Sequence, residues 1–116
     1  MSTLMKNDKT IAGLVSGMKL LWENSDPTSA FASQTITLAS GDYDLLIFVG
    51  RDSGYIISTI CPKGLNALLN AVVGNLRSNR LCTYISDTSY IIGQGYDATV
   101  VNNDRSIPVA VYGIKF

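Results

Sequence analysis

Histidine is absent from the 116 residues of the chain. Imidazole is the side chain that most often acts as a general base near neutral pH, activates a catalytic serine or cysteine, and binds a transition metal. Its absence excludes most hydrolase mechanisms. Glutamate is nearly absent too, since Glu23 is the single example, whereas asparagine, serine, threonine and glycine are frequent. These residues suit turns and β-strands better than helices, so the composition favours a β protein.

Charge is scarce, at 16% of residues, while hydrophobic residues make up 47%. This balance excludes a disordered chain and predicts one folded domain. Nine lysines and arginines match nine aspartates and glutamates, and the basic residues are scattered singly from Lys6 to Lys115. A nucleic-acid-binding protein would need a basic patch, so we expect no nucleic-acid partner.

Cysteine occurs only at Cys61 and Cys82. Two thiols without histidine cannot provide the four ligands of a structural zinc site within one chain. Both lie in apolar, strand-like segments, which favours buried free thiols, and a disulfide between them is the alternative. We expect no metal and no other cofactor.

Long apolar runs are missing, because no segment approaches the ~20 residues that a membrane-spanning helix requires. The polar residues Asn7, Asp8, Lys9 and Thr10 also interrupt the N-terminal segment, which therefore lacks the apolar stretch of a signal peptide. We expect no membrane insertion and no cleaved leader.

Hydrophobic periodicity predicts the elements that are present. Ile11, Leu14, Val15 and Met18 have the spacing of a short amphipathic helix, a candidate for docking between subunits. Beyond this segment, apolar residues recur at every second position, as in a strand with one buried face. Residues 45–49 are instead continuously apolar, as expected of a buried central strand. The predicted strands are residues 20–22, 34–38, 45–49, 55–61, 80–86, 89–94, 98–101 and 107–116.

One segment is ambiguous. The apolar residues of 64–77 fit a helical stripe, whereas Gly64 and Gly74 argue for a strand. The remaining segments give seven or eight short strands with a turn about every ten residues, which is typical of an antiparallel sandwich or barrel. We expect Trp22 to anchor the core, and Pro108 to lie at an edge position that tolerates it.

The fold prediction is accordingly all-β. We predict a jelly-roll-like antiparallel β-sandwich formed by residues 18–116. An N-terminal segment, residues 1–17, should precede it as a short helical or extended stretch that serves assembly or docking.

Two stretches point to a known family. Residues 20–49 have the sequence LLWENSDPTSAFASQTITLASGDYDLLIFV, and residues 107–115 have the sequence IPVAVYGIK. They resemble the C-terminal domain of many bacteriophage tail-fibre and receptor-binding-type proteins, in which LW.N..P...F..QT leads into YD plus an apolar strand and the chain closes on IP...YGIK. The resemblance covers residues 18–116, about 85% of the chain. It implies an all-β adhesion or virion module, commonly homotrimeric, and it favours a strand within residues 64–77.

The resemblance implies a function as well. We expect a virion structural protein of the tail or capsid surface, made in the host cytoplasm, that forms a homotrimer. It would contact other virion proteins and a host-surface glycan or protein, without catalysis. A capsid decoration or head-fibre protein is one alternative. A small glycan-degrading enzyme is another, with Asp42 and Asp44 as an acid/base pair on one strand face, although a polar turn before a buried strand explains the same aspartates.

Tyrosine suits receptor binding, because it combines an apolar ring with a hydroxyl group. Tyr90 and Tyr96 lie beside predicted loops, as does Arg51, and we predict that these three side chains contact the receptor. The competing interpretation is that each tyrosine covers the edge of the core. The predicted loops are residues 51–54, 87–90 and 94–97.

Overall fold

A computed structural model describes residues 17–116 of the protein. Residues 11–16 of the predicted helix, and all but the last residue of the predicted docking segment, lie outside this described part. Met18, the last residue of the predicted helix, is instead the first residue of strand β1 (Met18–Glu23).

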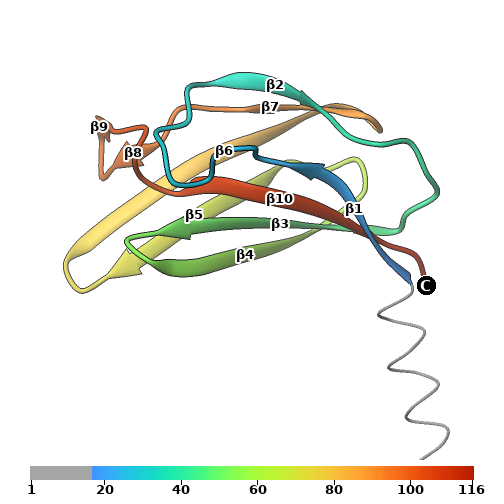
Figure 1. The fold of residues 1–116 in the computed structure, drawn as a ribbon, viewed down its shortest axis with the longest axis horizontal. Helices are drawn as coiled ribbons and strands as arrows, with labels where there is room; N and C mark the ends of the chain where they lie inside the picture. The colour runs from blue at the N-terminus through green and yellow to red at the C-terminus, as the bar shows by residue number, and fades with distance from the viewer. Residues whose placement is uncertain (1–16) are drawn as a thin grey trace, which may run out of the picture.

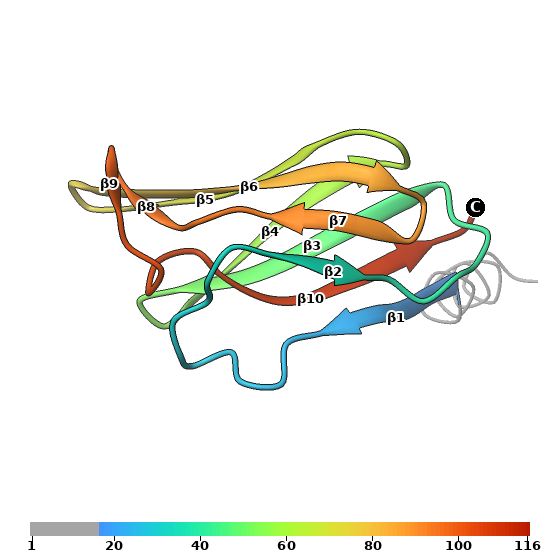
Figure 2. The same ribbon diagram turned by 90° about the horizontal axis from the view of Figure 1, so that it is seen from above.

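The described chain forms two antiparallel sheets that pack against each other (Figures 1 and 2). One sheet has four strands in the order β1-β10-β3-β4, and the other has six, in the order β2-β7-β6-β8-β9 with β5 paired to β6. The predicted antiparallel β-sandwich is confirmed. The strands after β1 are β2 (Gln34–Thr37), β3 (Leu45–Asp52), β4 (Tyr55–Pro62), β5 (Ala67–Val73), β6 (Leu76–Ser86), β7 (Ser89–Ile92), β8 (Tyr96–Asp97), β9 (Val100–Val101) and β10 (Ile107–Ile114).

The core lies between the sheets and takes inward-facing residues from β1 to β7 and from β10. Phe48 of β3 meets Tyr90 of β7 across the two sheets, with ring centroids 5.0 Å apart and planes at 65°. This edge-on arrangement is favourable for aromatic rings. Trp22, the predicted anchor, is half-buried and packs at the margin of the core against Phe31, with ring centroids 6.0 Å apart.

The ambiguous segment is a hairpin and contains no helix. Strand β5 turns through Gly74 and Asn75 into β6, with Val73 opposite Leu76. Gly74 has a φ of +61°, a conformation that glycine adopts without steric cost and that suits a tight hairpin turn. The preference for a strand is therefore confirmed, and the helical spacing was misleading.

Pro108 does not lie on an edge strand, which corrects the prediction. Strand β10 is paired on both sides, with β1 and with β3. The pairing of β10 with β3 shifts register between Pro108 and Ala110. Such a β-bulge tolerates a residue without an N–H donor inside a sheet.

Both cysteines are free and buried, as predicted. Burial raises the pKa of Cys82 to about 12 and also raises the pKa of Cys61. The thiol of Cys61 lies 3.2 Å from the carbonyl oxygen of Leu65, to which it can donate a hydrogen bond. Because the thiolate is the reactive form, both groups are chemically inert at neutral pH.

Candidate functional site

Several loops meet at one end of the sandwich, toward the left of Figures 1 and 2. We call this region the loop end. Its backbone segments are held together by Arg80, a fully buried side chain on β6. The guanidinium group donates to five backbone carbonyl oxygens at distances of 2.7 to 3.1 Å. The accepting carbonyls belong to Phe31, Gly93, Asn103, Arg105 and Ser106.

This clamp joins three loops that are distant in the sequence: the β1–β2, β7–β8 and β9–β10 connections. Burial lowers the pKa of Arg80 to about 10, so the group is still a cation at neutral pH. Its charge is balanced by carbonyl dipoles, which accept stronger hydrogen bonds from a charged donor than from a neutral one. Gly95 lies against the clamp, where an added Cβ would stand 2.6 Å from Arg80 Nη2. The loop end is therefore a rigid platform.

A second buried polar group, the Asp52 carboxylate at the end of β3, ties the same region together. It accepts from Arg105 Nε at 3.0 Å, from the backbone N–H of Ser106 at 2.9 Å, and from the hydroxyls of Ser53 and Ser78. Burial alone would raise the pKa of Asp52, but these hydrogen bonds outweigh it and hold the pKa below the ordinary value. The carboxylate is thus fully engaged in structure.

Arg105 extends this network toward the surface. Its Nη1 lies 3.0 Å from Oδ2 of Asp97 on β8, so one guanidinium joins a buried and a partly exposed carboxylate. Asp52 and Asp97 together hold the pKa of Arg105 above its ordinary value, chiefly through the hydrogen bond to Asp52. The β3–β4 turn and β8 are therefore at the same end of the molecule.

The structure brings two of the three predicted receptor residues to the loop end. Arg51, half-buried on β3, donates through Nη1 to the carbonyl oxygen of Pro27 at 3.3 Å. Tyr96 is half-buried on β8. The residues that follow them in the sequence, Asp52 and Asp97, both contact Arg105, and this shared contact places Arg51 and Tyr96 at the same end of the sandwich.

Tyr90 corrects the prediction. Its side chain is fully buried, packs against Phe48 and Tyr84, and donates to the carbonyl oxygen of Leu65 at 2.7 Å. Because this side chain is buried, it cannot contact a receptor in this fold. The neighbouring β6–β7 turn lies at the opposite end of the sandwich (Figure 1), so the predicted loop at residues 87–90 is remote from the loop end.

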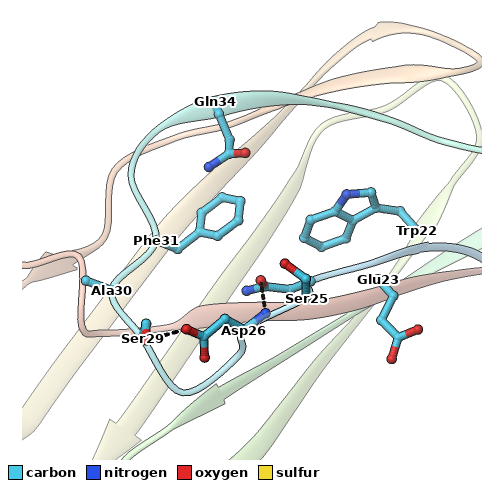
Figure 3. Close-up of a pocket in the computed structure, with 9 residues that line it drawn as sticks. Trp22, Glu23, Ser25, Asp26, Ser29, Ala30, Phe31 and Gln34 are labelled. Atoms are coloured by element: carbon cyan, nitrogen blue, oxygen red, sulfur yellow. Dashed lines mark hydrogen bonds between the residues drawn. The ribbon is translucent and has the colours of Figure 1, made fainter.

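A cleft of about 330 Å³ opens beside the β1–β2 loop, and we call it the Trp22 cleft (Figure 3). The sequence did not predict this site, since Trp22 was expected only to anchor the core. Trp22 and Phe31 form an aromatic corner with ring planes at 82°. Gln34 enters from β2, in the other sheet. The remaining lining residues are Glu23, Asn24, Ser25, Asp26, Ser29 and Ala30.

Local hydrogen bonds fix the loop that forms this cleft. Asn24 donates through Nδ2 to the carbonyl oxygen of Pro108 at 2.8 Å and accepts from the backbone N–H of Asp26 at 3.0 Å. Asp26 in turn accepts from the hydroxyls of Ser29 and Thr28, at 2.6 and 3.0 Å. These bonds, the one from Ser29 foremost, lower the pKa of Asp26, which is ionised at neutral pH.

Asp42 and Asp44, the possible acid/base pair, share an ion-pair partner. Lys115 Nζ lies 3.4 Å from a carboxylate oxygen of each. Asp44 also accepts from the backbone N–H of Phe116, which is the main reason that its pKa is lowered. A general acid requires a raised pKa, so this arrangement favours the structural interpretation of the pair.

The outer face of the four-stranded sheet is a second candidate surface. Leu20, Tyr112, Ile47 and Ile60 are register partners in one row across β1, β10, β3 and β4. They point away from the core, because the next residues along β3, Leu46 and Phe48, point into it. We call this surface the apolar sheet face. Its members are Leu20, Leu45, Ile47, Val49, Ile56, Ile60 and Tyr112.

Comparisons with known proteins add no assignment. No family model, no curated protein and no solved structure matched the chain. Within residues 17–116, no helix has the length and hydrophobicity to cross a membrane, and no three His, Cys, Asp or Glu side chains lie together as metal ligands would.

Proposed function

We propose that this protein is a bacteriophage virion structural module of the tail-fibre or receptor-binding type, which assembles as a homotrimer and contacts the host surface without catalysis. The sequence resemblance at both ends of the β domain supports the virion role. The observation that carries the proposal is the apolar sheet face, because assembly with further copies of the chain would bury it.

Within residues 17–116, no segment covers the apolar sheet face. A strand that is apolar on both sides, such as β3, normally has both faces buried. Here the inner face of β3 packs in the core, whereas Ile56 and Ile60 of the adjoining β4 are 69% and 63% exposed on the outer face. Contiguous exposed apolar surfaces of this kind mark interaction sites.

The size of this surface suits another copy of the chain. Four strands about 4.8 Å apart and about eight residues long cover roughly 500 Å² in projection. A standard interface buries roughly 800 Å² per partner, so this face would supply about 60% of one. A threefold arrangement would bury this face near the axis and leave β8 and β9 free, with Arg51, the register partner of Ile56, at the edge of the buried face.

The loop end supplies the surface for host contact in this proposal. Arg51 and Tyr96 lie on loops or strand ends that Arg80 and Asp52 hold in place. Binding residues are commonly placed on loops that a rigid scaffold positions. Threefold repetition lets weak individual contacts add to strong attachment.

Assembly should be lost in a Leu20→Lys/Ile60→Lys double variant. The two side chains are 43% and 63% exposed in the single chain, so lysine is tolerated there, whereas the assembled interface would bury unpaired charges. Light scattering at micromolar concentration should show a trimer for the natural protein and a monomer for the variant.

The matched control is Thr35→Lys/Asn70→Lys. These two polar residues are exposed on strands β2 and β5 of the other sheet, so the trimer should persist. A monomeric natural protein would refute the assembly, and so would a trimer that survives lysine at positions 20 and 60.

Host binding should weaken strongly in an Arg51→Ala/Tyr96→Ala double variant. Both side chains are half-buried and lie outside the core cluster, so the double variant should lose only about 1 kcal/mol of stability. The trimer and its thermal unfolding should therefore be nearly unchanged while adsorption to host cells falls. Asp87→Ala, at the opposite end of β6, is the control and should adsorb normally. Full adsorption by the double variant would show that these two residues do not contribute to receptor binding.

A further inference from the structure

We infer that the Trp22 cleft binds one neutral sugar ring. This inference deepens the proposed host-contact role, on which it rests for its biological setting, by naming the ligand class and a place for it. The place differs from that predicted by sequence, because neither Arg51 nor Tyr96 lines the cleft.

The aromatic corner provides the apolar part of the site. Trp22 is half-buried, so one part of the indole packs against Phe31 while the rest faces the cleft (Figure 3). A pyranose presents C–H groups on its flat face and hydroxyls around its edge, which matches an exposed aromatic surface surrounded by polar groups. A volume of about 330 Å³ lies at the lower end of the range for small-molecule sites and suits a single ring.

Polar groups around this corner are available to hydroxyls. Gln34 uses Nε2 to donate to the carbonyl oxygen of Ala32 at 3.1 Å. Within residues 17–116, Gln34 Oε1 and the Ser25 hydroxyl make no hydrogen bond, although both residues line the cleft. Asp26 is held as a carboxylate with its two oxygens aligned by Thr28 and Ser29. Carboxylates accept strong, charge-assisted hydrogen bonds from hydroxyl groups.

The charge of the cleft selects against acidic ligands. Glu23 and Asp26 both contribute carboxylates, and none of the described lining residues is a lysine or an arginine. Two cations contact this loop without lining the cleft: Arg51 directs its Nη1 to the backbone of Pro27, and the buried Arg80 lies over the Phe31 ring, 5.5 Å from its centroid. A sialic acid or uronic acid would bring a third negative charge without a partner, so the site favours a neutral hexose or N-acetylhexosamine.

The cleft is already organised for binding. Arg80 fixes the carbonyl of Phe31, and Asn24 fixes the β1–β2 loop to β10 through Pro108. A preformed site avoids the entropy cost of ordering a loop around the ligand. A ligand with about twelve non-hydrogen atoms still has little surface to bind, so we expect a Kd in the range of about 1 to 10 mM for each site. Repetition in an oligomer would then supply useful avidity.

Fluorescence gives a direct test, because Trp22 is the only tryptophan of the chain. The probes are the methyl glycosides of glucose, galactose, mannose and N-acetylglucosamine, titrated to 100 mM into the natural protein. At least one should change the Trp22 emission along a saturable curve. Methyl glucuronide should bind at least tenfold more weakly than the best neutral glycoside. Saturation-transfer NMR provides a second measurement of the same binding.

Variants locate the effect. Gln34→Ala should raise the Kd of the best neutral glycoside about fivefold or more. Glu23→Gln should reduce the difference in Kd between that glycoside and methyl glucuronide, because one carboxylate of the cleft is removed. Tyr55→Ala, which changes a 62% exposed tyrosine outside the cleft, should bind as the natural protein does. The inference is overturned if all four glycosides fail to bind, or if Gln34→Ala leaves the Kd unchanged.

The same measurements separate this inference from the proposed function. If glycosides fail to bind while the natural trimer still adsorbs to cells, the sugar site is refuted and the host-contact role is supported. If glycosides bind at the cleft but the trimer does not adsorb to cells, the host-contact role is refuted and the sugar site is supported.

Discussion

Replacing Arg80 by methionine should lower the free energy of unfolding by about 3 to 5 kcal/mol. Methionine retains much of the aliphatic stem of arginine but none of its five donors, so five carbonyl oxygens at the loop end lose this partner. The Asn103 oxygen still accepts from the backbone N–H of Phe31 at 3.0 Å. A buried polar group without a partner retains its full desolvation cost. Because domains of this size have a total stability of only about 5 to 15 kcal/mol, the variant should be close to unfolding.

Urea denaturation at pH 7 measures this loss. Arg80→Lys should restore little of it, since an ammonium group has three donors and cannot reach five carbonyls arranged around a planar guanidinium. Arg77→Met is the matched control, because Arg77 is exposed on the same strand and should change stability by less than about 0.5 kcal/mol. A loss below about 1 kcal/mol for Arg80→Met would show that the clamp contributes little to the fold.

The sequence predicted the sandwich because most strands have clear signals. Residues 34–38 alternate between polar and apolar, and tight turns separate β3 from β4 and β6 from β7. The hairpin of β5 and β6 was ambiguous for a physical reason. Leu68 and Val72 are exposed on its outer face while Leu69 is buried in the core, so apolar residues on both faces erase the period of two.

The prediction that Tyr90 contacts the receptor was wrong because turn residues do not specify which face of the sheet a nearby strand residue occupies. A residue one position into a strand after a turn can face either side of the sheet, and the pairing of β6 with β7 shifts register between Tyr84 and Ser86. Tyr90 pairs with Tyr84 on the inner face and becomes part of the core. A register shift of one residue exchanges the two faces, and turn residues alone do not specify it.

The candidate site depends on contacts between sheets that no sequence pattern contains. Trp22 and Gln34 lie on β1 and β2, which belong to different sheets, and they meet only because the sandwich closes. Arg80 likewise occurs in a strand-like run as an ordinary charged residue. Its burial depends on three loops whose carbonyls converge on one point.

Replacing Asp52 by asparagine should destabilise the protein by about 3 kcal/mol at pH 7, because Arg105 would lose the charge that balances it in a buried position. Asp97→Asn is the matched control, since its carboxylate contacts the same guanidinium but its side chain is 35% exposed. Water screens that second contact, so its removal should cost less than about 1 kcal/mol. Urea denaturation of both variants gives the comparison.

The pH dependence of stability tests the same ion pair independently. The pKa of Asp52 is lower in the folded protein than its ordinary value of 3.8, so its contribution is fully present above that value and is lost as the pH falls through the lower, folded pKa. Asp26 and Asp44 also have lowered pKa values and contribute to the same acid loss, but both are exposed. Between pH 5 and pH 2, stability should therefore decline less in Asp52→Asn than in the natural protein, whereas Asp97→Asn should retain most of the decline. Equal slopes for the two variants would mean that the Asp52 carboxylate does not stabilise the fold through its charge, and the buried network would then act through its hydrogen bonds alone.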